Sequence, residues 1–195
     1  MPRSPEEIAD ELLVLRCQRR DPGAWDELVS RFHDRLFYFV RRLVTDEDRA
    51  GQLIQDAWLQ IIRSLQSLRR AERLTPWLYT IVRRTVLNEI RRAYATPEEL
   101  AGDSLDGFPL PETESNPTSA FENAELVHYG LSRLGLVERE VLTLFFLEEM
   151  SIEEVATVLE IPPGTVKSRL ARARGELRQI LERDGNSPAF EVNSR

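Results

Sequence analysis

The chain has 195 residues, a net charge of −7 and an apolar content of 42%, which is enough to form packed cores. Its single cysteine excludes a disulfide framework and a cysteine-rich metal site, and its two histidines are far apart in sequence. It has no long apolar run and no secretion signal, so we predict a cytoplasmic protein without a membrane span. Motifs for phosphate-binding loops, catalytic triads and metal sites are also missing, so we expect neither an enzyme nor a cofactor.

The charge is unevenly distributed along the chain. Residues 24–94 carry 13 arginines against 9 acidic residues, whereas residues 95–124 carry 7 acidic residues and no basic ones. Residues 163–178 carry five basic residues and one acidic residue. The acidity of the whole chain therefore hides two locally basic regions on either side of an acidic connector.

Helical spacing of apolar residues predicts four helices in the first half of the chain. The first, over residues 6–20, places Cys17 at an apolar position, which favours a buried structural thiol over a redox switch. Asp21 and Pro22 are typical of a helix start, as N-cap and first helical residue. The third helix carries an apolar stripe, and a fourth is opened by Pro76. The stripe consists of Leu53, Ile54, Ala57, Trp58, Ile61, Ile62 and Leu65.

Residues 95–120 differ from the rest of the chain because they hold four prolines, two glycines and only acidic charge. This composition is typical of a flexible linker. Helical patterns resume at residue 121, and Ser151 with Glu154 predicts a capping box at the start of a later helix. The sequence therefore predicts an all-α fold. Two small helical domains, 5–94 and 121–183, are joined by the acidic linker 95–120 and followed by a disordered tail, 184–195.

The stretch "SIEEVATVLEIPPGTVKSRLARARGEL" predicts a helix-turn-helix. On its second helix, Val166, Leu170, Ala173 and Leu177 form the core stripe. The opposite side carries the small residues Ser168, Ala171 and Gly175 together with Arg172, and further cations lie on both flanks. Such a helix can approach a major groove closely, with Arg172 reaching a base edge. The alternative is a solvated, charged surface helix.

These patterns resemble a known family. "GTVKSRLARAR" and "VEREVLTLFFLEEMSIEEVATVLEI" resemble region 4 of bacterial sigma-70-family factors, in particular the extracytoplasmic function (ECF) group. "AWDELVSRFHDRLFYFVRRLV", "QLIQDAWLQII" and "PWLYTIVRRTVLNEIRR" resemble region 2 in order and spacing. The resemblance implies a factor, monomeric when free, that binds core RNA polymerase and promoter DNA and has no catalytic site. Many members are held inactive by an anti-sigma factor, but nothing in the sequence identifies one.

The resemblance also implies three sets of site residues. Trp58, Trp77 and Tyr79 are expected in the core, and base stacking is the alternative for Trp77 and Tyr79. Core polymerase would be contacted by Gln52, Gln55, Asp56 and Leu59. The −10 element would be contacted by Arg69, Arg70, Arg73, Arg83, Arg84, Asn88, Arg91 and Arg92, with the loop 69–75 capturing a flipped base. The −35 element would be contacted by Thr165, Lys167, Ser168, Arg169, Ala171, Arg172 and Arg174.

Three residues depart from the family pattern. Arg84 stands where a small amide is common, Glu160 where glycine is usual, and Pro162 where a hydroxyl side chain would cap the helix. Neither Glu160 nor Pro162 lies on the DNA-contacting side of the second helix, so we expect DNA binding to remain.

Two alternatives stay open at this point. One is a helix-turn-helix regulator that binds DNA without polymerase, and the other is an adaptor that binds polymerase but not DNA.

Overall fold

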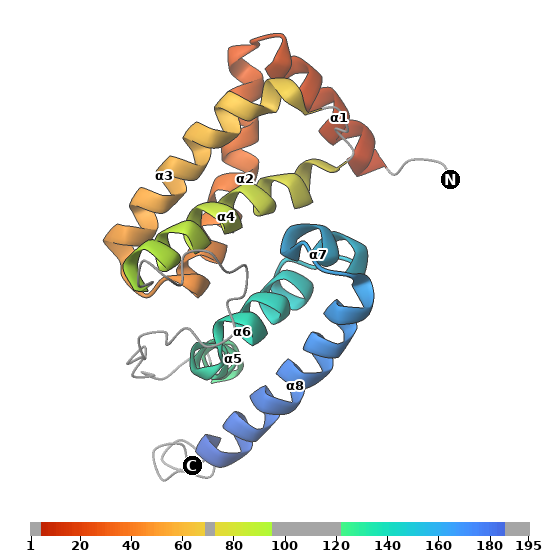
Figure 1. Ribbon diagram of the computed structural model, residues 1–195. Coiled ribbons are helices and arrows are strands. Elements are labelled where there is room, and N and C mark those ends of the chain that lie inside the picture. The colour runs from red at the N-terminus through yellow and green to blue at the C-terminus, as the bar shows by residue number, and fades with distance from the viewer. Residues whose placement is uncertain (1–4, 69–72, 95–121, 186–195) are drawn as a thin grey trace. The chain divides into compact units, whose positions relative to one another are not determined.

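The computed structural model describes residues 5–68, 73–94 and 122–185 (Figure 1). Helices dominate this part of the chain and it contains no strand, which confirms the predicted all-α fold. None of the described helices is long and apolar enough to cross a membrane. The helices are α1 (Pro5–Gln18), α2 (Pro22–Leu43), α3 (Glu47–Ser64), η1 (Leu65–Ser67), α4 (Leu74–Tyr94), α5 (Glu122–Arg133), α6 (Leu136–Leu142), the π-helical turn η4 (Thr143–Leu147), α7 (Ile152–Leu159) and α8 (Pro163–Gly185).

Helices α1 to α4 belong to a first compact unit, and α5, α6 and α8 belong to a second. In the first unit, α2 supplies much of the core through Leu28, Phe32, Leu36, Phe39 and Leu43. The ring of Phe39 packs edge-on against Tyr79 of α4, with centroids 5.3 Å apart. An aromatic pair of this kind stabilises the packing of α2 on α4 beyond the apolar area that it buries.

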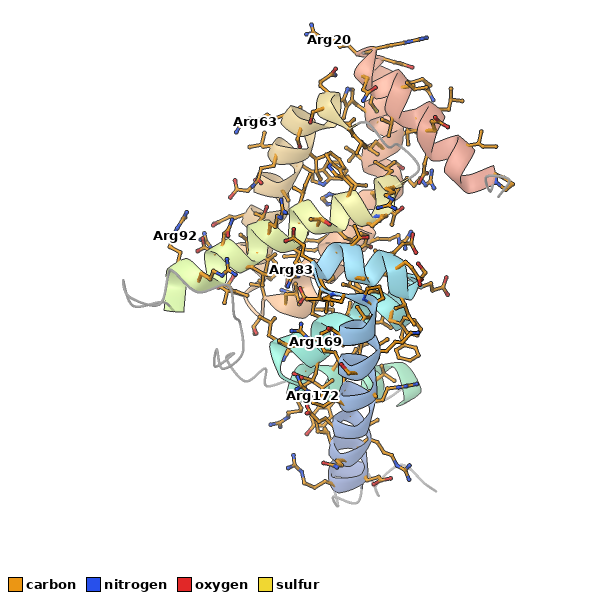
Figure 2. All side chains as sticks on the ribbon, turned by 45° about the vertical axis from the view of Figure 1, so that its right-hand side comes forward. Arg20, Arg63, Arg83, Arg92, Arg169 and Arg172 are labelled. Carbon is orange, nitrogen blue, oxygen red and sulfur yellow. The ribbon has the colours of Figure 1, made fainter. Side chains whose placement is uncertain are left out.

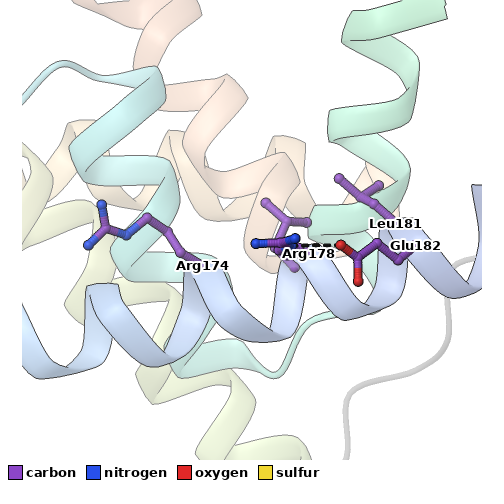
Figure 3. A pocket seen from close by; sticks show the side chains of 5 residues that line it. Arg174, Arg178, Leu181 and Glu182 are labelled. Carbon is purple, nitrogen blue, oxygen red and sulfur yellow. Dashed lines mark hydrogen bonds and ion pairs between the residues drawn. The ribbon is translucent and has the colours of Figure 1, made fainter.

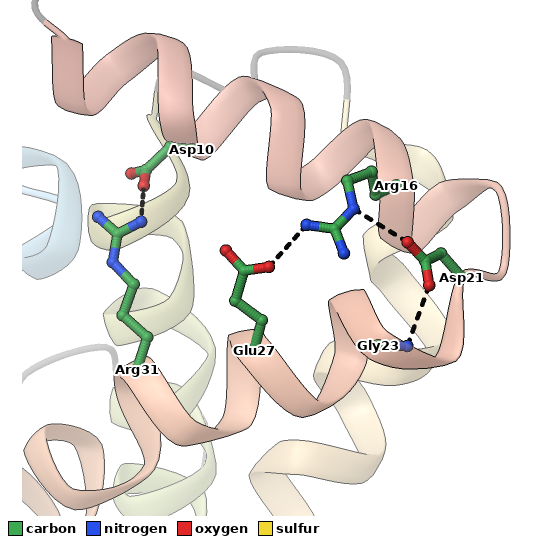
Figure 4. A network of polar contacts seen from close by, with 6 residues as sticks. All are labelled: Asp10, Arg16, Asp21, Gly23, Glu27 and Arg31. Atoms are coloured by element: carbon green, nitrogen blue, oxygen red, sulfur yellow. Dashed lines mark hydrogen bonds and ion pairs between the residues drawn. The ribbon is translucent and has the colours of Figure 1, made fainter.

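Ion pairs fasten α1 along α2 (Figure 4). The guanidinium of Arg16 contacts Asp21 at 2.9 Å and Glu27 at 2.6 Å. Asp21 also caps α2 as predicted, accepting a bond from the backbone N–H of Gly23 at 3.0 Å. The hydrogen bond from Arg16 lowers the pKa of Asp21, so the carboxylate stays ionised further into the acid range.

Cys17 and His33 are both part of the packing of the first unit. Cys17 is fully buried, and burial raises the pKa of its thiol, as expected of an inert structural cysteine. His33 accepts a hydrogen bond at Nδ1 from the indole N–H of Trp58 at 3.1 Å. Trp58 is buried, as the sequence predicted.

The predicted apolar stripe of α3 is wrong at one position. Ile62 is 48% exposed, whereas the adjacent Ile61 is fully buried. Neighbouring residues on a helix point about 100° apart, so only one of the two isoleucines can face the core. Apolar residues on the first helix, Ile8, Leu12 and Leu15, are likewise exposed.

The second unit is built around the buried helix α6. Arg139 of this helix donates from Nη2 to the backbone oxygens of Ser132 at 2.7 Å and Leu134 at 2.8 Å. It thereby satisfies carbonyls at the end of α5, which have no partner within that helix. Gly130 lets α5 approach α8, because a Cβ there would lie 2.5 Å from Cδ1 of Leu177.

The helix-turn-helix begins with the predicted capping box. The backbone N–H of Ser151 donates to Glu154 Oε2 at 2.9 Å, and the N–H of Glu154 donates to Ser151 Oγ at 3.2 Å. In the turn, Glu160 adopts a φ of 58°, the left-handed conformation that the family pattern gives to glycine. Pro162 contributes only its carbonyl, which accepts from the N–H of Thr165 at 2.9 Å.

Candidate functional site

The residues predicted to contact polymerase share one face of α3. All four, Gln52, Gln55, Asp56 and Leu59, are exposed. At about 100° per residue, Gln52, Asp56 and Leu59 lie within about 60° of one another. Leu59 is 50% exposed.

Sequence reasoning missed two members of this face. Ile62 and Arg63 lie on the same side of α3 as Leu59 and are also exposed. Arg63 projects from α3 in Figure 2. The missed signal was the Ile61–Ile62 pair, because only one of two consecutive apolar residues on an amphipathic helix can be buried. The α3 face is therefore two adjacent exposed apolar side chains surrounded by polar ones.

On α4, the predicted −10 residues divide between two sides of the helix. Arg84, Asn88 and Arg91 lie within about 60° of one another at 100° per residue, with Arg92 close beside them. Arg83 lies on another side and is only 8% exposed. The structure therefore separates Arg83 from the exposed cations of α4, because its side chain is buried.

Acidic neighbours moderate part of the charge of α4. Glu89 forms an ion pair with Arg49 of α3 and accepts a hydrogen bond from Arg92 Nη1 at 3.5 Å. Figure 2 shows Arg92 at the C-terminal end of α4. Glu89 thus joins α4 to α3. The exposed side chains Asn88 and Arg84 lie about one and two turns, respectively, towards the N-terminus from Arg92.

Two aromatic residues at the start of α4 have different environments. Tyr79 is fully buried, as predicted. Trp77 is only half-buried, and it projects from the same side of the helix as Arg84 and Asn88. The sequence placed both residues in the core, so the structure adds Trp77 to the candidate face of α4.

The predicted base-capture loop between α3 and α4 is only partly described. Arg69 and Arg70 lie outside the described residues, and Arg73 is exposed just before α4. The side-chain amide of Gln18 donates to the backbone oxygens of Leu65 and Leu68, each at 3.0 Å. Gln18 therefore fixes the position from which the chain leaves α3.

The recognition helix α8 has the predicted division into a buried and a small-residue side. Val166, Leu170 and Ala173 are buried, whereas Ser168, Ala171 and Gly175 are exposed. A Cβ on Gly175 would have no atom within 4 Å, so the surface there is open. The exposed cations Lys167 and Arg174 lie on one flank, and Thr165 and Arg169 are half-exposed on the other. Figure 2 shows Arg169 and Arg172 along α8.

Arg172 has a partner that the sequence did not reveal. Its Nη2 donates to Oε1 of Glu138, in the first turn of α6. Its Nε also lies 3.9 Å from Glu176 Oε1, one helical turn further along α8. Glu138 and Arg172 are 34 positions apart in the sequence, so no local pattern predicts this pair.

Beyond the reading face, α8 borders an open hollow of about 360 Å³ (Figure 3). It is lined by Arg174, Leu177, Arg178, Leu181 and Glu182. Arg174 Nε donates to the backbone oxygen of Leu170 at 3.3 Å, and Arg178 pairs with Glu182 at 2.6 Å. Among the described residues, no group of three or more His, Cys, Asp or Glu side chains could hold a metal ion.

Comparison with known proteins identifies the family to which the chain belongs. The family model described as Sigma-70 region 2 matches residues 28–96, and that described as Sigma-70, region 4 matches residues 125–177. The chain is 32% identical to the RNA polymerase sigma-H factor of Pseudomonas aeruginosa over 182 residues, covering 89% of this chain and 94% of that protein. The chain belongs to the ECF group of sigma-70-family RNA polymerase sigma factors.

A second relative and a solved structure give the same family and fold. The chain is 32% identical to the ECF RNA polymerase sigma-E factor of Escherichia coli over 178 residues, covering 87% of this chain and 92% of that protein. The solved structure of CnrH in complex with the cytosolic domain of CnrY has the same fold, with a TM-score of 0.67, 23% identity, and coverage of 90% of this chain and 99% of that one.

Membership of this family confirms the predicted function. The protein is a transcription initiation factor that binds core RNA polymerase and directs promoter-specific transcription. The alternative of a regulator that acts without polymerase is not favoured.

Proposed function

We propose that the three faces divide the work of initiation. The α3 face docks on core polymerase, the α4 face handles the −10 element, and the small-residue side of α8 reads the −35 element. The observation that carries the proposal is the exposed strip of Ser168, Ala171 and Gly175 with cations on both flanks.

Helix α8 is suited to the major groove because its outer side is narrow. Small side chains let the helix axis approach the base edges, which an α-helix can reach in a groove about 12 Å wide. Lys167 and Arg174 on one flank and Arg169 on the other suit the phosphates on either side of that groove. Arg172 carries the guanidinium that can contact a guanine edge.

Helix α4 is suited to a separated strand. Arg91 provides charge along the strand backbone, and Asn88 provides a donor and an acceptor beside it. Arg84 and Arg92 would exchange their carboxylate partners, Glu160 and Glu89, for phosphates of the strand. The half-buried indole of Trp77 offers a surface on which an unpaired base can stack. Arg83, on another side of the helix, is left out of this assignment, and Arg73 stands beside the entry to α4.

The α3 face is suited to a protein partner. Its centre is apolar, at Leu59 and Ile62, and its edge is polar, at Gln52, Gln55 and Asp56. A central apolar contact surrounded by polar groups is the arrangement in which a few residues provide most of the binding energy.

We expect Leu59→Asp to weaken binding to core polymerase by about 10- to 100-fold. Val29→Asp, at an exposed apolar residue of α2, is the matched control and should have no effect.

The decisive experiment is run-off transcription with purified core polymerase on a promoter library. Sequence-selective products that depend on the added protein are expected. Selective, salt-sensitive binding of the isolated protein to duplex DNA, without selective products, would instead indicate the polymerase-independent regulator. Arg172→Ala tests the remaining alternative, an adaptor that binds polymerase but not DNA. In such an adaptor the substitution would leave the choice of promoters unchanged.

The acidic connector has a proposed role of its own, although residues 95–120 lie outside the described residues. Non-specific DNA binding depends on phosphate neutralisation, so a net-negative chain suppresses it. We propose that the carboxylates of the connector lie near the basic nucleic-acid channel of polymerase. The protein would act in the cytoplasm, where polymerase works. Neutralising the connector should raise DNA binding by the free protein or weaken initiation, and a change in neither would exclude this role.

A further inference from the structure

We propose that Glu138 is a positioning residue for promoter reading. It holds the guanidinium of Arg172 in an orientation that contacts a base edge instead of a phosphate. The inference rests on the proposed −35 role of α8 and adds a residue from α6 that makes no DNA contact itself.

Glu138 is buried in the first turn of α6. Its side chain is 10% exposed, so a carboxylate at this position needs a charged or hydrogen-bonding partner. Arg172 supplies that partner, while its own side chain remains 57% exposed. The pair is thus anchored at its carboxylate end and accessible along its arginine, which is the arrangement required for a guanidinium that must meet DNA in one orientation.

The chain leaves space for the carboxylate of Glu138 beside Gly135. A Cβ on Gly135 would lie 2.8 Å from Glu138 Oε2, closer than side-chain carbons normally approach an oxygen. Glycine at position 135 therefore makes room for Glu138 in its present position. Glu138 also lies in the first turn of α6, where the helix dipole favours a negative charge.

Carboxylates on two sides balance the charge of Arg172. Glu138 and Glu176 place two negative charges beside its one positive charge. Arg172 therefore adds little to the attraction of α8 for phosphates, unlike Lys167 and Arg174. A neutralised guanidinium releases few counterions and distinguishes bases through hydrogen-bond geometry. Holding a long side chain in advance also reduces the conformational entropy that is lost on binding.

The test uses the complete protein with core polymerase and a promoter library in which each −35 base is varied. We expect Arg172→Ala to remove roughly 5- to 100-fold discrimination at one base position. Glu138→Gln keeps the size of the side chain but removes its charge, and should lower discrimination at the same position by about 3- to 10-fold. The double variant should resemble Arg172→Ala alone, because the two residues act as one unit.

A second measurement separates positioning from a merely structural role. With its charge less neutralised, Arg172 should engage phosphates in the Glu138→Gln variant. Non-specific duplex binding should then rise, and the slope of log K against log salt should steepen by up to about 0.9. Glu182→Gln removes the partner of Arg178, away from Arg172, and is the matched control that should change neither measurement. Gly135→Ala keeps both side chains of the pair but displaces the carboxylate of Glu138, and we expect it to affect the same base by about 2- to 5-fold.

Several outcomes would overturn the proposal. One is a Glu138→Gln variant with the wild-type base preference and salt slope. Another is an equal loss at all promoters, with a lower melting temperature and an unchanged slope, which would make Glu138 a structural residue only. A third is unchanged base preference in Arg172→Ala, which leaves nothing to position. In that case the run-off products of the wild-type protein would still report whether the chain acts as a sigma factor.

Discussion

Helices α4 and α8 both carry several arginines, but the neighbours of those arginines differ. On α8 the cations flank small residues, Ser168, Ala171 and Gly175, and the central Arg172 is held by carboxylates. On α4 the cations stand beside a half-buried tryptophan and an exposed asparagine. A narrow helix surface suits the groove of a duplex, whereas an aromatic surface suits unstacked bases. Charge alone therefore does not distinguish the two helices, and their neighbouring uncharged residues do.

The strongest test of this contrast adds bulk to the small-residue side of α8. Ala171→Trp should keep the helix out of the groove and reduce −35-dependent binding by about 100-fold, the loss expected from one or two base contacts. The measurement is promoter binding by the holoenzyme. Glu182→Trp, further along the same helix, is the control. Normal −35 binding by Ala171→Trp would mean that α8 reads DNA through another surface.

The next test removes the aromatic surface of α4. Trp77→Ala should cost about 1 to 3 kcal/mol of open-complex stability, the usual value of one base stack, and leave −35 recognition unchanged. Permanganate footprinting of the melted region measures this. Transcription from a promoter with a pre-separated −10 strand should also be reduced, since the lost contact is to the separated base. Equal loss on promoters with and without a −10 element would show that Trp77 is only a packing residue.

A smaller effect is expected from a phosphate contact on the flank of α8. Arg174→Ala should weaken all promoters alike and reduce the salt slope of binding by about 0.9, as expected for one phosphate. Titration of promoter duplexes at several salt concentrations checks this. A change in which promoters are chosen would contradict the division of α8 into reading and positioning residues.

The smallest effect concerns the cap of the helix-turn-helix. Ser151→Ala removes the hydroxyl that accepts from the N–H of Glu154, and should cost about 1 kcal/mol of unfolding free energy. Chemical denaturation followed by circular dichroism measures the loss. Base preference at −35 should stay the same, because the cap stabilises α7 without touching the reading side of α8. A changed preference would mean that the cap also sets the position of the recognition helix.

Much of the local structure could be predicted from the sequence. The caps at Asp21 and at Ser151 with Glu154 were confirmed, as were the buried Trp58 and the left-handed residue at position 160. These features depend on residues a few positions apart, so helical periodicity and capping chemistry are sufficient to find them. The family was also evident from the order of its two sets of motifs.

The rest was decided by tertiary structure. Ile62 and Trp77 were placed in the core from periodicity, yet one is exposed and the other half-buried, because packing partners determine which edge of an apolar stripe is covered. The pair of Glu138 and Arg172 joins two helices far apart in the sequence, and no local rule relates them. The sequence by itself determined the caps that open α2 and α7, which sides of the helices are mostly apolar and what family they form. Only the packed chain determined which charges meet, since that depends on how α6 and α8 lie together.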